Sequence, residues 1–400
     1  MKVLLSEGSS LTAREHLTVL GRAGVKADVL SSISHPLCEF SRWTGTVHRV
    51  PSPSADPLGY LAAAGRLTET GGYDALLPTH EQAWLFAVGR KLLPTGIPLA
   101  VAPAMAFDRV QGKLAFCRLL DELDLPQPGW TEVAGVADVA GLGFPCWLKS
   151  DFSTAGRGVR LVHDNNTATA ALAELARPVL AQLPAPGNYA QVGALFDRGR
   201  LVAVHTSEKT GDGAGGSAAA RLSVDHPEVR AHVARVGAHL RWHGGMTFDY
   251  FHVDGRPQYI ECNPRTVEPG NAAASGVDLP MLTIALGSGA PMASTVAIGR
   301  AGVRTQSALA LMLGAAERTG RRHASVATLL KALTGRGYPD KEVLTPLRKD
   351  PKSALPLAIA AITVLRGPAS VRALAAKVVA AYSVTPSAID IVRSRVDQGV

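Results

Sequence analysis

The sequence predicts an α/β protein that is divided into several lobes, because three patterns follow one another along the chain. The first hundred or so residues alternate short apolar strands with helical stretches, which is typical of a doubly wound lobe. The middle contains strands joined by tight turns, and the last quarter reads as helices. A chain of 400 residues exceeds one ordinary core, so roughly two to four domains or lobes are expected.

The composition is that of a globular protein, with 46% hydrophobic and 18% charged residues. The four cysteines lie far apart without a CxxC pair, which argues against a disulfide framework or zinc site and favours a reducing cytosol. The N-terminal apolar run is too short for a signal peptide. No stretch approaches about eighteen uninterrupted apolar residues. We therefore expect a cytoplasmic protein without a transmembrane segment.

The net charge of +8 is concentrated in the last quarter of the chain. Residues 301–400 contain 15 basic and 6 acidic residues, a net of +9, while the other 300 residues contain 26 and 27, a net of −1. We interpret the basic tail as a solvated helical face. An anionic partner is the open alternative. The tail has only Tyr338 and Tyr382 as aromatic residues, so it lacks the stacking pattern of a nucleic-acid-binding surface.

The first lobe opens with a strand–helix–strand pattern over residues 2–31. Its Gly/Ser loop has no GxGxxG sequence, which excludes the fingerprint of an NAD-dependent dehydrogenase. A further buried strand is expected over residues 73–77. His80 and Glu81 follow it, in the place where open α/β sheets bind ligands. Capping of a helix by Thr79 is the competing interpretation of this segment.

A helix is expected from about residue 106 to Leu123, with Asp108 as its N-cap. Lys113 lies near its start, where a cation is usually unfavourable. The Pro/Gly-rich residues 125–129 break the helix. These signals place the first domain boundary near residue 105.

A strand that ends in Lys149 runs into a Gly/Ser/Thr-rich loop before the next strand, over 159–162. Such a loop can fold over phosphate groups and donate backbone N–H groups, and the lysine supplies positive charge. The loop alone is a weak signal, and the lysine directly before it strengthens the interpretation. The candidate phosphate-binding residues of the loop are Ser153, Thr154, Gly156 and Gly158.

The next segments predict a helix, a pair of strands and another helix. The first helix is expected over 172–181, and the strands over 188–196 and 200–205 with a turn at Asp197. The second helix is expected from about 227 to 240.

Residues 248–262 predict a β-hairpin with an Asp-Gly turn and a group of polar side chains. Asp249 lies on the first strand. Glu261 and Asn263 are two residues apart on the second, so their side chains share a face. Two carboxylates and an amide oxygen are the ligands that Mg²⁺ prefers when it also holds phosphates. Arg265 follows, with a guanidinium suited to phosphate or carboxylate. A surface hairpin with solvated charges is the alternative.

The order of these parts resembles the ATP-grasp superfamily of carboxylate–amine ligases, over roughly residues 1–290. The most specific match is Ile-Glu-Cys-Asn-Pro-Arg at 260–265, and the second is Phe-Pro-Cys-Trp-Leu-Lys at 144–149 with its loop. The resemblance implies a doubly wound N-terminal lobe followed by a two-lobe ATP-grasp core. The expected divisions are 1–104, 105–290 with a small lobe of about 125–195 and a metal-bearing lobe of about 196–290, and a basic helical region of 291–400.

The resemblance also implies ATP and Mg²⁺ as ligands, with Mn²⁺ as an alternative ion. The phosphates would contact Lys113 and Lys149, with the loop of 153–158 covering them. The backbone at the adenine edge would be that of Gln191, Val192 and Gly193. The metal ions would be held by Glu261, Asn263 and Asp249. The transferred phosphoryl group would be steadied by Arg265 and Arg221. Many relatives place a glutamate after the residue that matches Gln191. The acid that holds the ribose is left open between Asp197 and Glu208.

The chemistry implied by this resemblance is activation of a carboxylate. Phosphorylation by ATP converts a poor electrophile into an acyl phosphate that an amine can attack, with release of ADP. Positioning and charge neutralisation do most of this work, so no nucleophilic side chain is needed. We expect a small-molecule carboxylate and an amine, such as an amino acid, as substrates, and leave a homo-oligomer open. The alternatives are another nucleophile or bicarbonate, and an ATP-binding scaffold or sensor without turnover.

Overall fold

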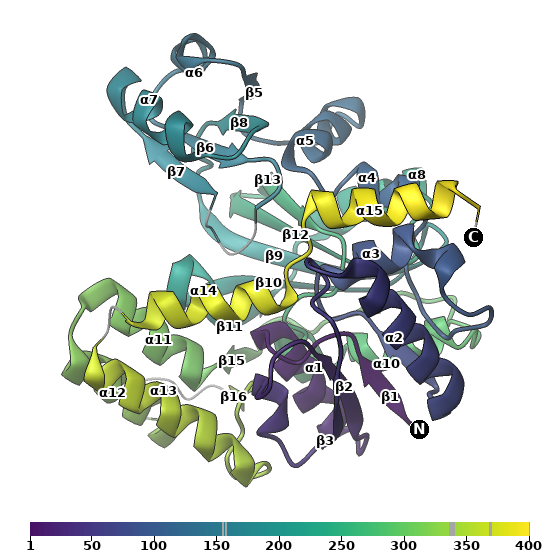
Figure 1. Ribbon diagram of the computed structural model, residues 1–400. Coiled ribbons are helices and arrows are strands. Elements are labelled where there is room, and N and C mark those ends of the chain that lie inside the picture. Colours follow the sequence, from purple (N-terminus) through teal and green to yellow (C-terminus); the bar gives the residue numbers. More distant parts are fainter. Residues whose placement is uncertain (154–155, 157, 336–340, 368–369, 400) are drawn as a thin grey trace.

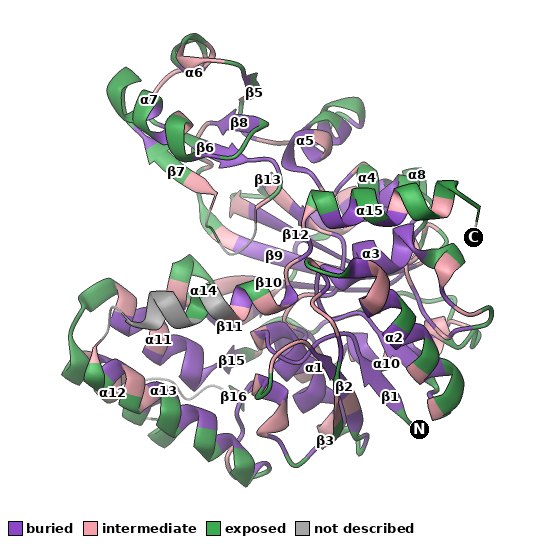
Figure 2. Cartoon of the chain, viewed as in Figure 1, coloured by how far each residue is buried: buried purple, intermediate pink, exposed green. Residues whose placement is uncertain are grey.

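The computed structural model describes residues 1–400 except 154–155, 157, 336–340, 368–369 and 400. It contains a parallel sheet near the N-terminus, a small antiparallel sheet and a large, mainly antiparallel sheet. The small sheet forms an upper lobe, and the other two sheets build the body of the molecule (Figure 1). Figure 2 shows the strands of the body as largely buried, while the outer faces of the peripheral helices are exposed.

The N-terminal sheet has the strand order β3-β2-β1-β4, and all of its pairings are parallel. This confirms the expected doubly wound opening. Its strands are β1 (Val3–Leu5), β2 (Ala27–Ser31), β3 (Thr44–Arg49) and β4 (Ala75–Leu77). Its helices are α1 (Leu11–Arg22), α2 (Pro57–Gly71) and α3 (Gln82–Val88). Helix α1 begins after Ser10, whose hydroxyl oxygen accepts a hydrogen bond of 2.9 Å from the Ala13 N–H. Thr79 does not cap α3, which begins after Glu81 without a side-chain cap.

The segment that leads into the second lobe differs from the expectation at its start. It forms two helices, α4 (Ala104–Asp108) and α5 (Lys113–Glu122). Asp108 therefore ends α4 instead of capping α5, and its carboxylate pairs with Arg393. Helix α5 begins after Gly112, so Lys113 is its first residue. The Asp151 carboxylate accepts a hydrogen bond of 2.8 Å from the Leu114 N–H, which places a negative charge beside the lysine at this helix end.

The small lobe is an antiparallel sheet of order β5-β8-β6-β7. Its elements are β5 (Trp130–Val133), α6 (Val136–Leu142), β6 (Cys146–Ser150), β7 (Val159–Val162), α7 (Asn165–Glu174) and β8 (Val179–Gln182). The helix predicted over 172–181 is wrong beyond Glu174, because α7 ends there and β8 begins at Val179. Strand β8 is buried between β5 and β6 along its whole length. A short apolar run without alternation does not distinguish such a strand from a helix.

The large sheet has the order β13-β12-β9-β10-β11-β15-β16, with β14 beside β10. Its strands from the middle of the chain are β9 (Asn188–Asp197), β10 (Arg200–Asp212), β11 (Ala218–Val224), β12 (Gly244–Val253) and β13 (Arg256–Asn263). Helix α8 (Pro227–His239) packs on β9 and β10. The β12–β13 hairpin turns at Asp254 and Gly255, which have φ of 48° and 73°. These positive values are those that the predicted Asp-Gly turn requires.

The C-terminal region contains the expected helices and also adds strands to the large sheet. The strands are β14 (Ala297–Ile298), β15 (Arg304–Gln306) and β16 (Lys341–Glu342). The helices from residue 270 onward are α9 (Gly270–Ala274), α10 (Leu279–Gly287), α11 (Ala308–Thr319), α12 (Arg322–Thr334), α13 (Ala354–Arg366), α14 (Ser370–Tyr382) and α15 (Pro386–Asp397). Helix α15 returns to pack on α2 and α3 of the first lobe. Among the described residues, no helix combines the length and the apolar character that a membrane crossing requires.

Candidate active site

The β12–β13 hairpin brings together the side chains predicted to bind metal. Asp249 pairs with Glu261, and Thr247 pairs with Asn263. The Asn263 side-chain N–H donates to Asp249 Oδ2 at 3.2 Å, and the Gln191 side-chain N–H donates to Asp249 Oδ1 at 2.8 Å. We name Asp249, Glu261 and Asn263 the carboxylate cluster. Burial, followed by the charge of Glu261, raises the pKa of Asp249 to about 6. The cluster therefore offers oxygen ligands whose charge a cation would stabilise.

Two buried lysines from different elements face this region. Lys113 Nζ lies 3.2 Å from Glu261 Oε1, and it donates to the Ser153 carbonyl at 3.1 Å. Lys149, the second-last residue of β6, donates to Gln182 Oε1 at 2.7 Å. Burial lowers the pKa of Lys149 to about 8. Lys113 thus links α5 to both the carboxylate cluster and the loop of residues 151–158 between β6 and β7, which we name the glycine loop.

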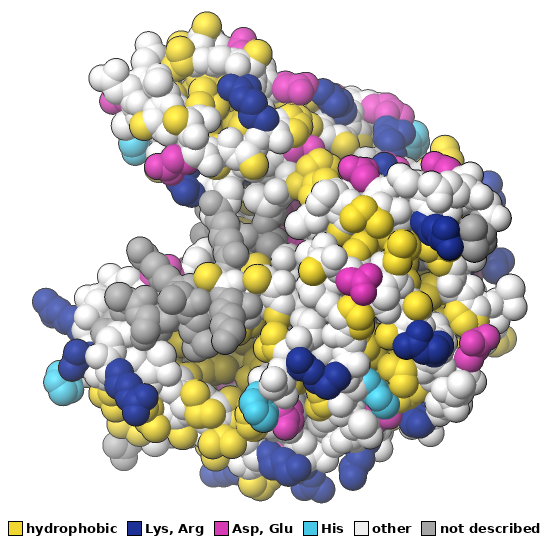
Figure 3. All heavy atoms as spheres, viewed as in Figure 1, with side chains coloured by type: hydrophobic (Ala, Val, Ile, Leu, Met, Phe, Trp, Pro, Cys, Tyr) yellow, Lys and Arg dark blue, Asp and Glu magenta, His cyan; other side chains and the backbone are white. Residues whose placement is uncertain are grey.

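The glycine loop connects β6 to β7 on the small lobe, and a notch separates this lobe from the body (Figure 3). Position 158 of this loop requires glycine, because a Cβ there would lie 2.6 Å from the Cβ of Ser153. Gly156 has a φ of 69°, a conformation that favours glycine. Thr154, another candidate of this loop, lies outside the described residues. The loop therefore reaches Lys113 through Ser153 at one end and folds tightly at the other.

Residues 191–193 lie within a strand, as predicted, but their backbone is not free to contact adenine. Strand β9 is internal to the large sheet, with β12 on one side and β10 on the other. Val192 pairs with both Phe248 and Thr206, so the backbone groups of this stretch are engaged in the sheet. Val192 is also buried in the core. The predicted backbone contact with adenine at Gln191, Val192 and Gly193 is therefore corrected, and Gln191 acts instead through its side chain on Asp249.

The two predicted arginines are buried beside acidic and histidine side chains. Arg221 Nη2 lies 2.6 Å from Glu268 Oε2, and Glu268 has a φ of 43°. Arg265 Nη2 lies 3.4 Å from His80 Nε2. Burial, together with the charge of Arg265, holds the pKa of His80 well below its usual value, so this imidazole is neutral. Arg265 therefore lies next to a neutral neighbour, whereas Arg221 is paired with Glu268.

Two acidic residues near these arginines, Glu7 and Glu15, were missed by sequence reasoning. Glu7 follows β1 and accepts hydrogen bonds from the N–H groups of Ser9 and Ser10, at 2.6 and 3.0 Å. Glu15 accepts one from the Gly270 N–H at 2.9 Å, and burial, then the charge of Glu268, raises its pKa to about 8. The available signal for Glu7 was its place directly after a strand of a parallel sheet.

The last residue of α14, Tyr382, and the segment between α14 and α15 contact the residues that follow β4. The rings of His80 and Tyr382 lie 4.2 Å apart between centroids. The Gln82 side chain donates to the Tyr382 carbonyl at 2.6 Å, and the Val384 N–H donates to Glu81 Oε2 at 2.8 Å. Glu81 therefore holds the C-terminal segment, and His80 lies between that segment and Arg265.

Neither candidate for the ribose-binding acid joins the carboxylate cluster. Asp197 lies at the β9–β10 turn, 3.6 Å from Arg200. Glu208 lies near His226 on the opposite face of the large sheet, because it pairs with Ala190, and Ala190 pairs with Tyr250, the residue after Asp249. The ribose-binding acid therefore stays open.

Several known proteins are similar to this chain. The arginine-specific carbamoyl phosphate synthase large chain of Geobacillus stearothermophilus is 26% identical over 206 residues, which is 48% of this chain and 20% of the relative. The carbamoyl phosphate synthase large chain of Thermomicrobium roseum is 23% identical over 286 residues, or 66% of this chain and 26% of the relative. The chain thus spans about a fifth to a quarter of these relatives. No family model matches the chain.

Solved structures show a closer correspondence in length. The carboxyaminoimidazole ribonucleotide synthase of Aspergillus clavatus, complexed with ATP, has a TM-score of 0.59 at 16% identity and covers 77% of this chain and 81% of its own. The biotin carboxylase domain of the Hydrogenobacter thermophilus 2-oxoglutarate carboxylase, in complex with MgADP, ADP and bicarbonate, has a TM-score of 0.58 at 15% identity and covers 76% and 73%. As the sequence predicted, the chain has the ATP-grasp fold.

Proposed function

We propose that this chain is an ATP-dependent, ADP-forming ligase that phosphorylates a carboxylate and joins the resulting acyl group to an amine. The observation that carries the proposal is the carboxylate cluster with Lys113 only 3.2 Å from Glu261. An ATP-dependent ligase is supported by the similarity to carbamoyl phosphate synthase chains and to the synthase complexed with ATP. Formation of a carbon–nitrogen bond is the more specific part of the proposal.

The carboxylate cluster fits Mg²⁺, or Mn²⁺ in its place. Its donors are oxygens of Asp249, Glu261 and Asn263, and the buried Asp249 carboxyl is charged only at a cost that a cation would offset. When bound, the ion would neutralise charge on the phosphates. Lys113 and Lys149 would bind the same phosphates, and the loop from Ser153 to Gly158 would exclude water from them.

The acid to be activated would meet Arg265 and Arg221. The neutral His80 beside Arg265 leaves the guanidinium charge available to an acyl phosphate oxygen. Arg221 is held in place by Glu268, which fixes its direction. These residues would bind and orient charge, and no covalent step falls to a side chain.

Bicarbonate is the second candidate for the acid. The biotin carboxylase domain with a TM-score of 0.58 contains MgADP and bicarbonate in its structure. In that case the product would be a carboxylated acceptor, formed through the same phosphorylation by ATP.

The test is a panel of acids, including bicarbonate, and of amines, each supplied with Mg²⁺ and ATP to the purified full-length chain. The expected products are ADP and phosphate, without AMP, for a matching pair. A chain that binds ATP yet releases no ADP with any pair would favour the scaffold or sensor. Release of AMP would contradict the acyl phosphate.

A further inference from the structure

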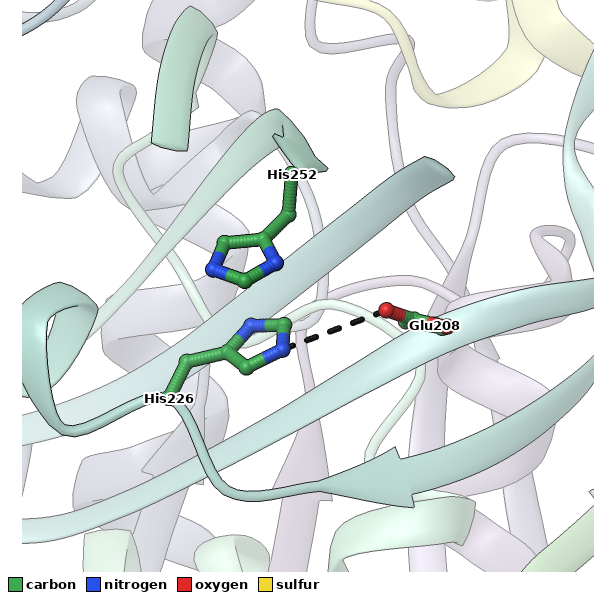
Figure 4. A group of neighbouring side chains, drawn as sticks. All are labelled: Glu208, His226 and His252. Carbon is green, nitrogen blue, oxygen red and sulfur yellow. Dashed lines mark ion pairs between the residues drawn. The ribbon is translucent and has the colours of Figure 1, made fainter. Parts of the chain in front are cut away.

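We propose that Glu208, His226 and His252 form a binding site for a divalent transition-metal ion of the zinc class (Figure 4). One ligand atom from each of these side chains lies within 4.8 Å of the other two. Two imidazole nitrogens and a carboxylate oxygen are a donor set typical of Zn²⁺, whereas Mg²⁺ prefers oxygen ligands. Glu208 is also a candidate for the ribose-binding acid, but it lies on the opposite face of the large sheet from Asp249. The proposal therefore uses none of the side chains assigned to phosphate, metal or acid.

This histidine cluster, defined as Glu208, His226 and His252, lies on the opposite face of the large sheet from the carboxylate cluster. Glu208 pairs with Ala190, and Ala190 pairs with Tyr250, so these three residues share a face. His252 follows two residues after Tyr250 and belongs to the same face, next to the start of α8. Asp249 directly precedes Tyr250 and so points to the other face. An ion at the histidine cluster would be separate from the one that holds phosphates.

Outer hydrogen bonds occupy one nitrogen of each ring and leave the other nitrogen for an ion. His226 Nδ1 lies 2.9 Å from the Tyr250 hydroxyl, and His252 Nε2 lies 2.7 Å from Glu228 Oε1. Metal-binding histidines usually donate their second N–H to an oxygen in this manner, which fixes the ring tautomer. The nitrogens left over are His226 Nε2 and His252 Nδ1, and Figure 4 shows a nitrogen of each ring on the side toward Glu208.

The side chains of the histidine cluster must move when an ion binds. His226 Nε2 lies 3.9 Å from Glu208 Oε1, which is longer than a hydrogen bond. The two rings are stacked, with centroids 3.6 Å apart and planes 15° apart. They must turn about their Cβ–Cγ bonds before both lone pairs point at one ion. The side chains of Glu208, His226 and His252 are 21%, 10% and 12% exposed, so solvent can supply the fourth ligand.

An ion at this place would tie together parts that lie far apart in the sequence. Glu208 comes from β10, His252 from β12, and His226 from the residue that precedes α8. The ion would therefore stabilise the face of the large sheet on which α8 packs. We infer a structural role, because the cluster lies on the other face from the side chains assigned to phosphate.

The experiment titrates the full-length chain, freed of metal by a chelator, with Zn²⁺ and separately with Co²⁺. The expected result is one bound equivalent, a rise in Tm with Zn²⁺, and a Co²⁺ absorption spectrum of low coordination number without a thiolate charge-transfer band. The His226→Ala and His252→Ala variants should each bind at least ten-fold more weakly. Glu208→Gln should weaken binding while keeping both imidazoles, which covers the case in which a histidine variant fails to fold.

His232→Ala is the matched control. His232 lies on α8 and, like His226, has a ring nitrogen near a tyrosine hydroxyl, 3.1 Å from that of Tyr259. It lies outside the histidine cluster, so its loss should leave Zn²⁺ binding unchanged. Equal Zn²⁺ binding by the wild type and the His226→Ala and His252→Ala variants would overturn the proposal, as would loss of the Co²⁺ spectrum in Glu261→Gln alone. The metal titration does not depend on ATP turnover, so failure of the ligase proposal would leave its result intact.

Discussion

Lys113 Nζ lies 3.2 Å from Glu261 Oε1, and this contact joins the first residue of α5 to the strand that carries the carboxylate cluster. The lysine is buried, while the Glu261 side chain is 36% exposed. The same ammonium group donates to the carbonyl of Ser153 in the glycine loop. One cation therefore connects the two lobes between which ATP is proposed to bind.

Replacement of Glu261 by Gln should abolish most of the proposed activity, because it removes a negative ligand of the metal and leaves the Lys113 charge unpaired. We expect ADP release to fall by about 100-fold or more. A coupled assay for ADP measures this effect. Glu132→Gln, at an exposed ion pair with Arg118 on the small lobe, should leave the rate unchanged. An unaltered rate in Glu261→Gln would remove this residue from the site.

ATP binding should weaken as the pH rises through about 8, because burial lowers the pKa of Lys149 to that value. The protonated amine attracts phosphate, so affinity is full below this pH and falls above it. Binding of the anion in turn raises the pKa, which spreads the loss toward higher pH. Calorimetric titration with ATP between pH 7 and 10 measures the trend. Lys149→Ala should bind ATP weakly and lose this part of the pH dependence. A wild-type profile identical to that of the variant would contradict the assignment.

Removal of the Asp350 carboxylate should destabilise the contact between the C-terminal region and the first lobe. Asp350 Oδ2 lies 2.7 Å from Arg14 Nη2, and both side chains are fully buried. Its carboxylate also accepts hydrogen bonds from the Ser41 hydroxyl and the Arg42 N–H. Asp350→Ala leaves a buried, unpaired guanidinium, so the free energy of unfolding should fall by about 3–5 kcal/mol. Urea unfolding measures this, and the exposed Asp390→Ala serves as the control. Equal stability of the two variants would contradict the role of the pair.

Loss of the Tyr382 ring should change the use of the acid or amine more than the binding of ATP. The ring lies against His80, which in turn lies against Arg265, on the side assigned to the acid. In Tyr382→Ala we expect a several-fold higher KM for the acid or the amine, with the Kd of ATP unchanged. Ile391→Ala, exposed on α15, is the control. A change confined to the Kd of ATP would place the C-terminal segment elsewhere in the mechanism.

The sequence predicted the parts of this site that follow from local periodicity. Glu261 and Asn263 share a face because strand side chains alternate, and the Asp254–Gly255 turn folds Asp249 back onto them. Lys149 is the second-last residue of β6, one residue earlier than the strand end that the sequence predicts, and the glycine loop follows this strand. A short apolar run does not distinguish a strand from a helix, so most of β8 falls within the helix that the sequence predicts over 172–181.

By itself, then, the sequence determined the fold class, the hairpin and the order of the charged groups, since each depends on neighbours within a few residues. Only the tertiary structure decided that β9 is internal to the large sheet, which takes the backbone of Val192 out of the proposed adenine contact. It alone placed Tyr382 against His80 and Glu208 beside two histidines. These contacts join residues that are far apart in the chain, and pairings between distant elements are set by packing that no local period encodes.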